Sequence, residues 1–285
     1  MTEKNKSQKQ NKIDSDLKNP ETSGQDTPKS HGEILKQQII EGQVTFDKSS
    51  GSILMSSLTA GLEIGFSHLL MCTLYSFLFG KIDEETIFKL MALVYPIGFI
   101  MVILGQSILF TEQTSLLTLP VLNNKRTLGS LLRLWGLVIV GNLAGGCVMG
   151  FILVWIGPRL EIFDLHSIEA IAVHVTKYDN WVIFVSAILA GWLMGLLSWL
   201  ITASKDTVSR ILIIFMITTV LAFAGLHHSI VGNVEVFAGL ISSAAIKWSS
   251  YVSFQCISLI GNAVGGAVFV ALLKYSAFVY NVEAE

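Results

Sequence analysis

Six apolar stretches run through most of this chain, and they restrict its fold more than any other feature. They cover residues 52–79, 88–120, 128–157, 181–202, 209–246 and 251–279. A helix needs about 20 mostly apolar residues to cross the hydrocarbon layer of a membrane. The chain is 52% hydrophobic and 14% charged, with a mean hydropathy of +0.62, which is more apolar than a soluble domain of this length. The sequence therefore predicts an all-α membrane protein of six transmembrane helices in a lipid bilayer.

Charge near the ends of these stretches predicts the orientation. An even number of crossings places both termini on one side. With the termini inside, the inner edges carry Lys125, Arg126, Arg133, Lys205, Arg210 and Lys274. The outer edges carry Lys81, Lys89, Arg159, Lys177 and Lys247. This small excess favours cytoplasmic termini, with the protein in the cell inner (plasma) membrane. The net charge of -2 gives no basic field, so no nucleic-acid partner is expected.

Composition divides the chain into four parts. Residues 1–32 are polar and predict a disordered cytoplasmic arm. Residues 33–50 have apolar side chains at helical spacing and predict a lead-in helix, which either lies across the cytoplasmic mouth or simply leads into the first crossing. Residues 51–280 form the transmembrane domain, and residues 281–285 form a C-terminal tail. The mixed connection at residues 158–179 is expected to be a long outer loop.

The two halves of the chain resemble each other. Gly141 begins the sequence GNLAGG in the third stretch, and Gly261 begins GNAVGG in the sixth, an offset of 261 − 141 = 120 residues. At the same offset, Gly105 in the second stretch aligns with Gly225 in the fifth. Each half contains three crossings, an odd number, so the second half enters the membrane in the opposite orientation. The sequence predicts two inverted three-helix repeats.

One stretch in each half is interrupted by polar residues near its middle. In the second stretch these are Gln106, Ser107, Thr111, Glu112, Gln113, Thr114 and Ser115. In the fifth they are His227, His228, Ser229, Asn233 and Glu235, with Gly225 and Gly232 among them. Polar groups at this depth must face protein or a water-filled cavity. Broken helices at matching places in inverted repeats are typical of a substrate site at the membrane midplane. Polar contacts that only join helices are the simpler alternative.

The adjacent histidines give little indication of metal-binding or catalytic chemistry. Neighbours on a helix point about 100° apart, so His227 and His228 cannot both face one narrow path. No ligand lies at helical spacing from them, and the sequence predicts neither a bound metal nor a cofactor. No nucleophile and base stand at catalytic spacing either, which favours a protein that is not an enzyme.

At these residues the sequence resembles the formate/nitrite transporter family over residues 34 to 279. The resemblance rests on LFT at residues 109–111, on the GNLAGG sequence and on GLHHSI at residues 225–230. It implies a pentameric assembly of aquaporin-like protomers with broken second and fifth helices. It also implies a mobile-loop hydroxyl at Thr111, a central histidine at His228, and an apolar constriction at Leu109 and Phe110. Lys177 corresponds to the basic residue of the outer vestibule.

The departures from the family pattern affect the substrate. His227 stands where the family has a glutamate, and Asn233 lies one position after the family's asparagine. Glu112 follows Thr111, where the family has small residues, and an ionised carboxylate there would repel an anion. Protonation, or pairing with His227 or Arg133, would remove that repulsion. We expect small monovalent weak-acid anions, similar to formate or nitrite, to pass through a pore in each protomer of a homopentamer.

Two alternatives remain open from the sequence. A pore for a neutral or weakly cationic solute would suit Glu112. An intramembrane sensor or enzyme would use the His227 and His228 pair. The site residues to follow in the structure are Leu109, Phe110, Thr111, Glu112, His227, His228, Asn233 and Lys177.

Overall fold

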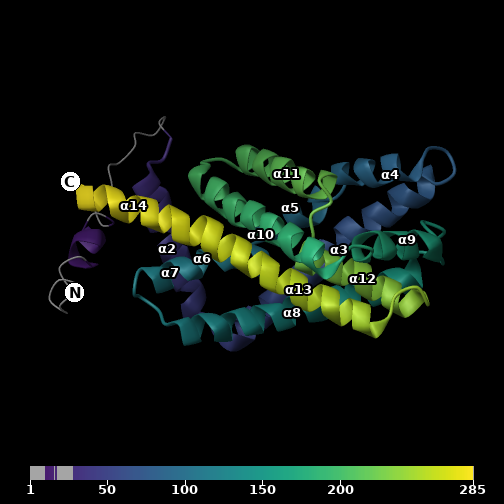
Figure 1. Cartoon of the computed structure of the whole chain (residues 1–285), viewed down its shortest axis with the longest axis horizontal. Coiled ribbons are helices and arrows are strands. Elements are labelled where there is room, and N and C mark those ends of the chain that lie inside the picture. Colours follow the sequence, from purple (N-terminus) through teal and green to yellow (C-terminus); the bar gives the residue numbers. More distant parts are fainter. Residues whose placement is uncertain (1–9, 16, 18–27, 285) are drawn as a thin grey trace.

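The computed structural model describes residues 10–15, 17 and 28–284, and these residues are mainly helical (Figure 1). Within them, five helices are long and apolar enough to cross a membrane. These are Ser50–Leu78, Glu84–Leu104, Leu128–Ile156, Asn180–Ala203 and Trp248–Val282. Two shorter apolar helices, Thr207–Phe223 and Ser229–Ser242, make up the predicted fifth stretch.

In the first half of the chain, helix α3 covers Ser50–Leu78 and is followed by α4 (Glu84–Leu90), a short turn η1 (Met91–Leu93) and α5 (Pro96–Leu104). Helices α6 (Phe110–Leu116) and α7 (Thr118–Leu122) complete the second apolar stretch, and α8 covers Leu128–Ile156. Polar side chains cap the start of three of these helices. Ser49, Asp83 and Thr127 each accept a hydrogen bond from a backbone N–H in the first turn of α3, α4 and α8.

The second half contains α10 (Asn180–Ala203), α11 (Thr207–Phe223) and α12 (Ser229–Ser242). A long final helix joins α13 (Trp248–Val264), the π-helical η2 (Gly265–Leu272) and α14 (Leu273–Ala284). The prediction of a loop at residues 158–179 is wrong in part, because α9 covers Leu165–Thr176. Asp164 caps this helix, and its apolar side Ile168, Ile171 and Ala172 is buried against α12.

Glycines let the helices pack closely in the same way in both halves. The helix pairs α3 with α8 and α10 with α13 have the most extensive contacts. A Cβ atom added to Gly145 on α8 would lie 2.1 Å from the backbone oxygen of Leu58. A Cβ atom added to Gly265 at the end of α13 would lie 2.2 Å from the backbone oxygen of Ile188. The repeated glycines therefore fit tight helix crossings.

The described ends of the chain pack together at one end of the molecule, away from α4 and α9 (Figure 1). Helix α2, His31–Asp47, is the predicted lead-in helix and contacts α7 and α10. The side chain of Gln38 on α2 donates hydrogen bonds to Ser198 Oγ at 3.1 Å and Thr202 Oγ1 at 2.6 Å on α10. Ile34, Leu35 and Ile39 of α2 are buried with residues of α7, α10 and the final helix.

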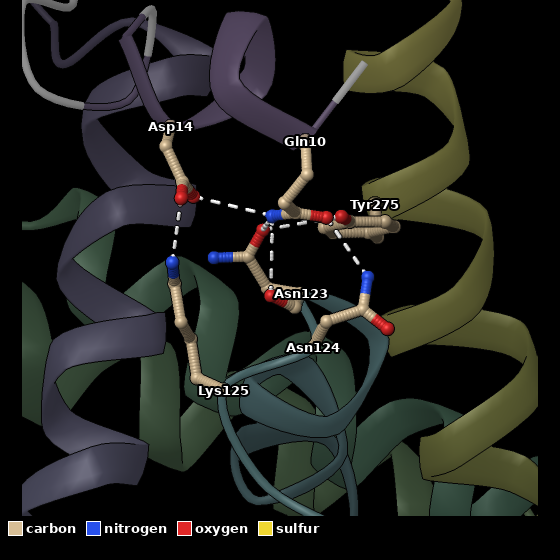
Figure 2. A network of polar contacts seen from close by, with 6 residues as sticks. All are labelled: Gln10, Asp14, Asn123, Asn124, Lys125 and Tyr275. Atoms are coloured by element: carbon tan, nitrogen blue, oxygen red, sulfur yellow. Dashed lines mark hydrogen bonds and ion pairs between the residues drawn. The ribbon is translucent and has the colours of Figure 1, made fainter. Parts of the chain in front are cut away.

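Part of the N-terminal arm differs from the predicted disorder. Residues 10–15 are helical, and Figure 2 shows their polar contacts with the α7–α8 connection, which in turn contacts Tyr275 of α14. Gln10 donates to Asn123 Oδ1 at 3.1 Å, Asp14 pairs with Lys125 at 2.6 Å, and Tyr275 donates to Asn123 Oδ1 at 3.2 Å. The other arm residues, 1–9, 16 and 18–27, lie outside the described residues.

Candidate functional site

The chain leaves the helical conformation at the same relative place in each half. Helix α5 ends at Leu104 and α6 begins at Phe110, while α11 ends at Phe223 and α12 begins at Ser229. Gln106, with a φ of 59°, and Gly225, with a φ of 67°, are the left-handed residues of the two connections. The backbone N–H after each, on Ser107 and Leu226, bonds five residues back, to Val102 O and Leu221 O, both at 3.0 Å. Gln106 and Gly225 are 119 residues apart, one fewer than the 120 residues that separate Gly105 from Gly225 in the sequence alignment.

Asn142 on α8 holds the first connection in place. Its side-chain oxygen accepts a hydrogen bond from the backbone N–H of Phe110 at 2.8 Å. Its amide donates to the backbone oxygens of Ile108 at 2.9 Å and Ser57 at 2.7 Å. Asn142 is fully buried, so it satisfies backbone groups that have no water to bond.

Asn262 on α13 holds the second connection. Its side-chain oxygen accepts from the N–H of Ser229 at 2.8 Å, and its amide donates to His227 O at 3.1 Å and Ala187 O at 2.7 Å. Both asparagines come from the repeated GN sequences, 120 residues apart. The repeat therefore supplies one anchor for each interruption.

Thr111 and His228 meet between these two connections. Thr111 lies in the first turn of α6 and His228 is the N-cap of α12. Their side chains are 0% and 2% exposed, and Thr111 Oγ1 lies 2.8 Å from His228 Nε2. His228 Nδ1 accepts from the backbone N–H groups of Ile230 at 3.3 Å and Val231 at 3.2 Å. Because Nδ1 accepts, Nε2 carries the proton of the neutral ring and donates it to the threonine oxygen.

Aromatic and aliphatic groups surround this polar pair. The ring of Phe99 on α5 contacts the His228 ring edge-on, with centroids 5.1 Å apart. Leu109 and Phe110 are buried beside Thr111, and Phe110 makes an edge contact with the Trp135 ring on α8, with ring centroids 5.9 Å apart. A bare anion is strongly disfavoured in such apolar surroundings.

A small cavity of about 80 Å³ leads to His228 from the side of α9. Met71, Tyr95, His227 and Phe254 are among the residues in its wall, together with Glu235 of α12. His227 is held there by hydrogen bonds of its two ring nitrogens, Nδ1 with Ser186 Oγ at 2.8 Å and Nε2 with Val175 O at 3.0 Å. His227 is therefore a fixed part of the cavity wall, while His228 lies at its inner end.

A larger vestibule of about 600 Å³ adjoins this cavity and shares Phe88, His174 and Tyr178 with it. Its polar lining comprises Glu84, Glu85, Lys89, His166, Glu169, His174 and Lys177. His174 stacks on Phe88 with ring centroids 3.7 Å apart, and Lys177 Nζ lies 3.3 Å from His174 Nδ1. Burial first, and then the positive charge of Lys177, lower the pKa of His174 from 6.5 to about 4. His174 is thus a neutral side chain between vestibule and cavity near neutral pH.

Glu112 lies on the other side of the polar pair, one residue after Thr111. It is partly buried and is near enough to Glu41 of α2 for the two carboxyl groups to interact electrostatically. Neither partner considered from the sequence pairs with it. His227 bonds to Ser186 and Val175, and Arg133 donates to Ser50 Oγ at 3.2 Å.

Asn233 lies apart from the other candidates. Its side-chain amide donates to Leu143 O at 3.1 Å, and its oxygen accepts from Tyr251 OH at 2.7 Å. It joins α12 to α8 and α13 and is not in the cavity wall. The sequence reasoning did not select Glu235 or His174, although Glu235 belongs to the polar group of the fifth stretch.

These features define a class of protein. Helices long enough to cross a membrane surround a cavity whose wall includes His228 of the buried Thr111–His228 pair. One asparagine in each half, Asn142 or Asn262, holds the connection next to this pair. A multi-pass membrane transporter or channel has this construction.

Comparisons with known proteins give the family. Residues 32–276 match the sequence profile described as Formate/nitrite transporter, and the chain belongs to this family. It is 30% identical over 242 residues to the Inner membrane protein YfdC of Escherichia coli (strain K12), covering 83% of this chain and 75% of that protein. The chain is therefore a multi-pass membrane protein.

Two solved structures share the fold. One, an FNT family ion channel, has a TM-score of 0.77 at 24% identity and covers 86% of this chain and 98% of its own. The other, a pentameric formate channel with formate bound, has a TM-score of 0.69 at 18% identity and covers 81% of this chain and 98% of its own.

Proposed function

We propose that this protein transports small monovalent weak-acid anions, similar to formate or nitrite, along a path through the Thr111–His228 contact. The observation that carries this proposal is the buried 2.8 Å contact itself, at the inner end of a cavity that adjoins a polar vestibule. The family and the formate-bound channel of similar fold support an anion as substrate.

The chemistry of the path favours a substrate that changes its protonation state. Lys177 and Lys89 offer positive charge to an anion in the vestibule, which Glu84, Glu85 and Glu169 also line. Beyond them, the apolar surroundings of His228 admit a neutral acid far more readily than its anion. The Nε2–H of His228 and the hydroxyl of Thr111 offer hydrogen bonds to a small solute at the narrowest polar point.

The proposed architecture has six crossings in two inverted repeats. The helices α5, α6 and α7 form one broken crossing, and α11 and α12 form the other. The equivalent hydrogen bonds of Asn142 and Asn262 support this assignment. We place both termini in the cytoplasm and α9 on the outer face of the inner membrane. The pentameric neighbour supports a homopentamer with one path in each protomer.

The first experiment measures uptake of formate, nitrite and hydrosulfide into proteoliposomes, with ammonium and glycerol as competing classes of solute. Flux of ammonium or glycerol without any of the three anions would overturn the proposal and favour a neutral or cationic substrate, for which Glu112 is the motivating residue.

The second experiment uses the Thr111–His228 contact. Thr111→Val removes the hydroxyl at nearly constant volume, and Thr111→Ser keeps it. A net hydrogen bond is worth about 1 kcal/mol, so we expect formate uptake to fall roughly fivefold in the valine variant. We expect the serine variant to stay within about threefold of the unchanged protein, because its hydroxyl can restore the contact. Equal rates in both variants would contradict a role for the hydroxyl.

A further inference from the structure

Glu235 is a buried carboxyl group that the transport path, as described so far, does not use. It lies seven residues after His228, so two helical turns place both on the same face of α12, about 10 Å apart along the helix. Its side chain is 6% exposed and lies in the wall of the cavity that ends at His228. It makes no hydrogen bond or ion pair with any residue that the structure describes.

The groups around Glu235 offer it no counter-ion. The cavity beside Glu235 is also lined by the titratable side chains of Tyr95, His174, Tyr178, His227 and His228, and none of these is a lysine or an arginine. The helices packed against α12 carry further titratable groups, which are Glu63, His68, Cys72, Tyr75, Glu112, Arg133, Cys147, His166, Glu169, Tyr251 and Cys256. Arg133, the one cation of fixed charge on these helices, donates to Ser50 Oγ at the start of α3. Cys72 and Tyr95 are near enough to interact electrostatically with Glu235. A carboxylate in these surroundings has lost its water without gaining a cation, whereas a carboxyl group that holds its proton avoids this cost.

The other ionisable groups of the cavity are less suited to exchange a proton. Both ring nitrogens of His227 are engaged, by Ser186 and by a backbone oxygen. His228 accepts backbone N–H groups at Nδ1 and contacts Thr111 at Nε2. Tyrosine is a weak acid with a pKa near 10. Among the groups in the cavity wall, Glu235 alone combines a carboxylic acid with oxygens that no described residue bonds.

We propose that Glu235 is the proton donor of this path: its carboxyl group protonates the weak-acid anion in the cavity beside His228. This inference rests on the proposed function. The anion enters from the vestibule and takes the carboxyl proton, so that an O–H bond of Glu235 breaks and one forms on the solute. The products are the neutral acid, which passes His228 and Thr111, and the Glu235 carboxylate. The carboxylate then takes a proton from hydronium in the adjoining vestibule, or from water with release of hydroxide to the solution, which restores the starting state.

Formate uptake into proteoliposomes tests this assignment with three variants of the full chain. Glu235→Gln keeps the volume and the polarity but cannot donate an acidic proton. Glu235→Asp keeps an acid on a shorter side chain. Glu161→Gln is the matched control, since Glu161 is exposed in the connection before α9 and lies outside both cavities. Size-exclusion chromatography in detergent shows whether each variant keeps the assembly of the unchanged protein.

The pH dependence distinguishes proton donation from a structural role. We expect Glu235→Gln to lower uptake at least about tenfold near pH 8, a typical loss for an acid–base group. Near pH 5 the solution itself supplies much more formic acid, so the loss should shrink to about threefold or less. Glu235→Asp should retain an intermediate rate, and Glu161→Gln should match the unchanged protein at both pH values.

Two results would overturn the inference. Uptake by Glu235→Gln that equals the unchanged protein at both pH values would show that the carboxyl group is not used. A reduction by the same factor at both pH values would show that Glu235 only supports the structure. If the unchanged protein moves no weak-acid anion at either pH, the proposed function itself fails, which is a different result from either of these.

Discussion

Asn142 and Asn262 make the same set of hydrogen bonds to two different parts of the chain. Each accepts one backbone N–H at 2.8 Å where a helix restarts and donates to one backbone oxygen just before it. Each also donates to a neighbouring helix at 2.7 Å, Asn142 to α3 and Asn262 to α10. The contact between Thr111 and His228 therefore depends on two equivalent anchors, one in each half.

Replacing either asparagine by alanine should destabilise the protein by a similar amount. Each substitution leaves a buried backbone N–H without a partner and removes one hydrogen bond from each of two backbone oxygens, at a cost of about 1–3 kcal/mol. Thermal unfolding in detergent would measure this for Asn142→Ala and Asn262→Ala. Thr59→Ala is the control, because Thr59 is exposed and bonds only to Met55 of its own helix, and it should change stability by less than about 0.5 kcal/mol. A large effect at only one asparagine would contradict their equivalence.

Gly266→Ala should displace α6. A Cβ atom there would lie 1.9 Å from Thr114 Oγ1, on the helix that carries Thr111. Overpacking of this kind costs about 1–3 kcal/mol, and the shift of α6 should also slow uptake. Gly129→Ala introduces the same methyl group on α8, where nothing lies within 4 Å, and should leave both stability and uptake nearly unchanged. Equal behaviour of the two variants would show that α6 does not depend on this contact.

Substitutions at the left-handed residues of the two connections should change the stability of the protein in opposite directions. Gly225 has a φ of 67°, so Gly225→Ala should destabilise the protein by about 1 kcal/mol. Gln106 has a φ of 59° and carries a side chain, so Gln106→Gly should be neutral or stabilising by up to about 1 kcal/mol. Thermal unfolding of the two variants side by side checks the signs. Loss of stability in Gln106→Gly would mean that the glutamine side chain contributes more than its backbone conformation costs.

His174 predicts a pH dependence at the vestibule. Because its pKa in the folded protein, about 4, is below the ordinary value of 6.5, folding favours the neutral ring. Its contribution to stability is complete above about pH 6.5 and is lost as the pH falls toward 4. Histidine NMR, assigned with His174→Gln, should show this low pKa. Lys177→Met should raise the pKa of His174, because it removes a nearby positive charge, and an unchanged titration would contradict the role of Lys177.

The contacts that hold the two connections could not be read from the sequence. Polar residues near the middle of an apolar stretch indicate where helix α5 ends and α6 begins, since such groups are expensive in lipid. The anchor for that connection, Asn142, lies 32 residues away from Phe110 along the chain. The GN repeat was visible, yet a glycine-rich motif indicates close packing and does not show which backbone groups an asparagine will bond.

The direction in which Glu235 and Asn233 point depends on the residue at which helix α12 begins. His228 caps α12, and this start brings Glu235 into the cavity and turns Asn233 toward Tyr251. A shift of one residue rotates a side chain by about 100°, so the sequence alone could not assign these faces. Helix α9 was missed because its buried side is short and lies within a polar connection.

The two asparagine anchors are alike, but the chemistry beside them is not. His174 and Lys177 line the vestibule at the α9 end, whereas Glu112 lies near Glu41 of α2. Carboxyl groups also line the vestibule, at Glu84, Glu85 and Glu169, so a carboxyl-directed reagent would react at both ends. A membrane-impermeant reagent directed at histidine should therefore act from the α9 face, and it would report which way the protein is inserted in a vesicle.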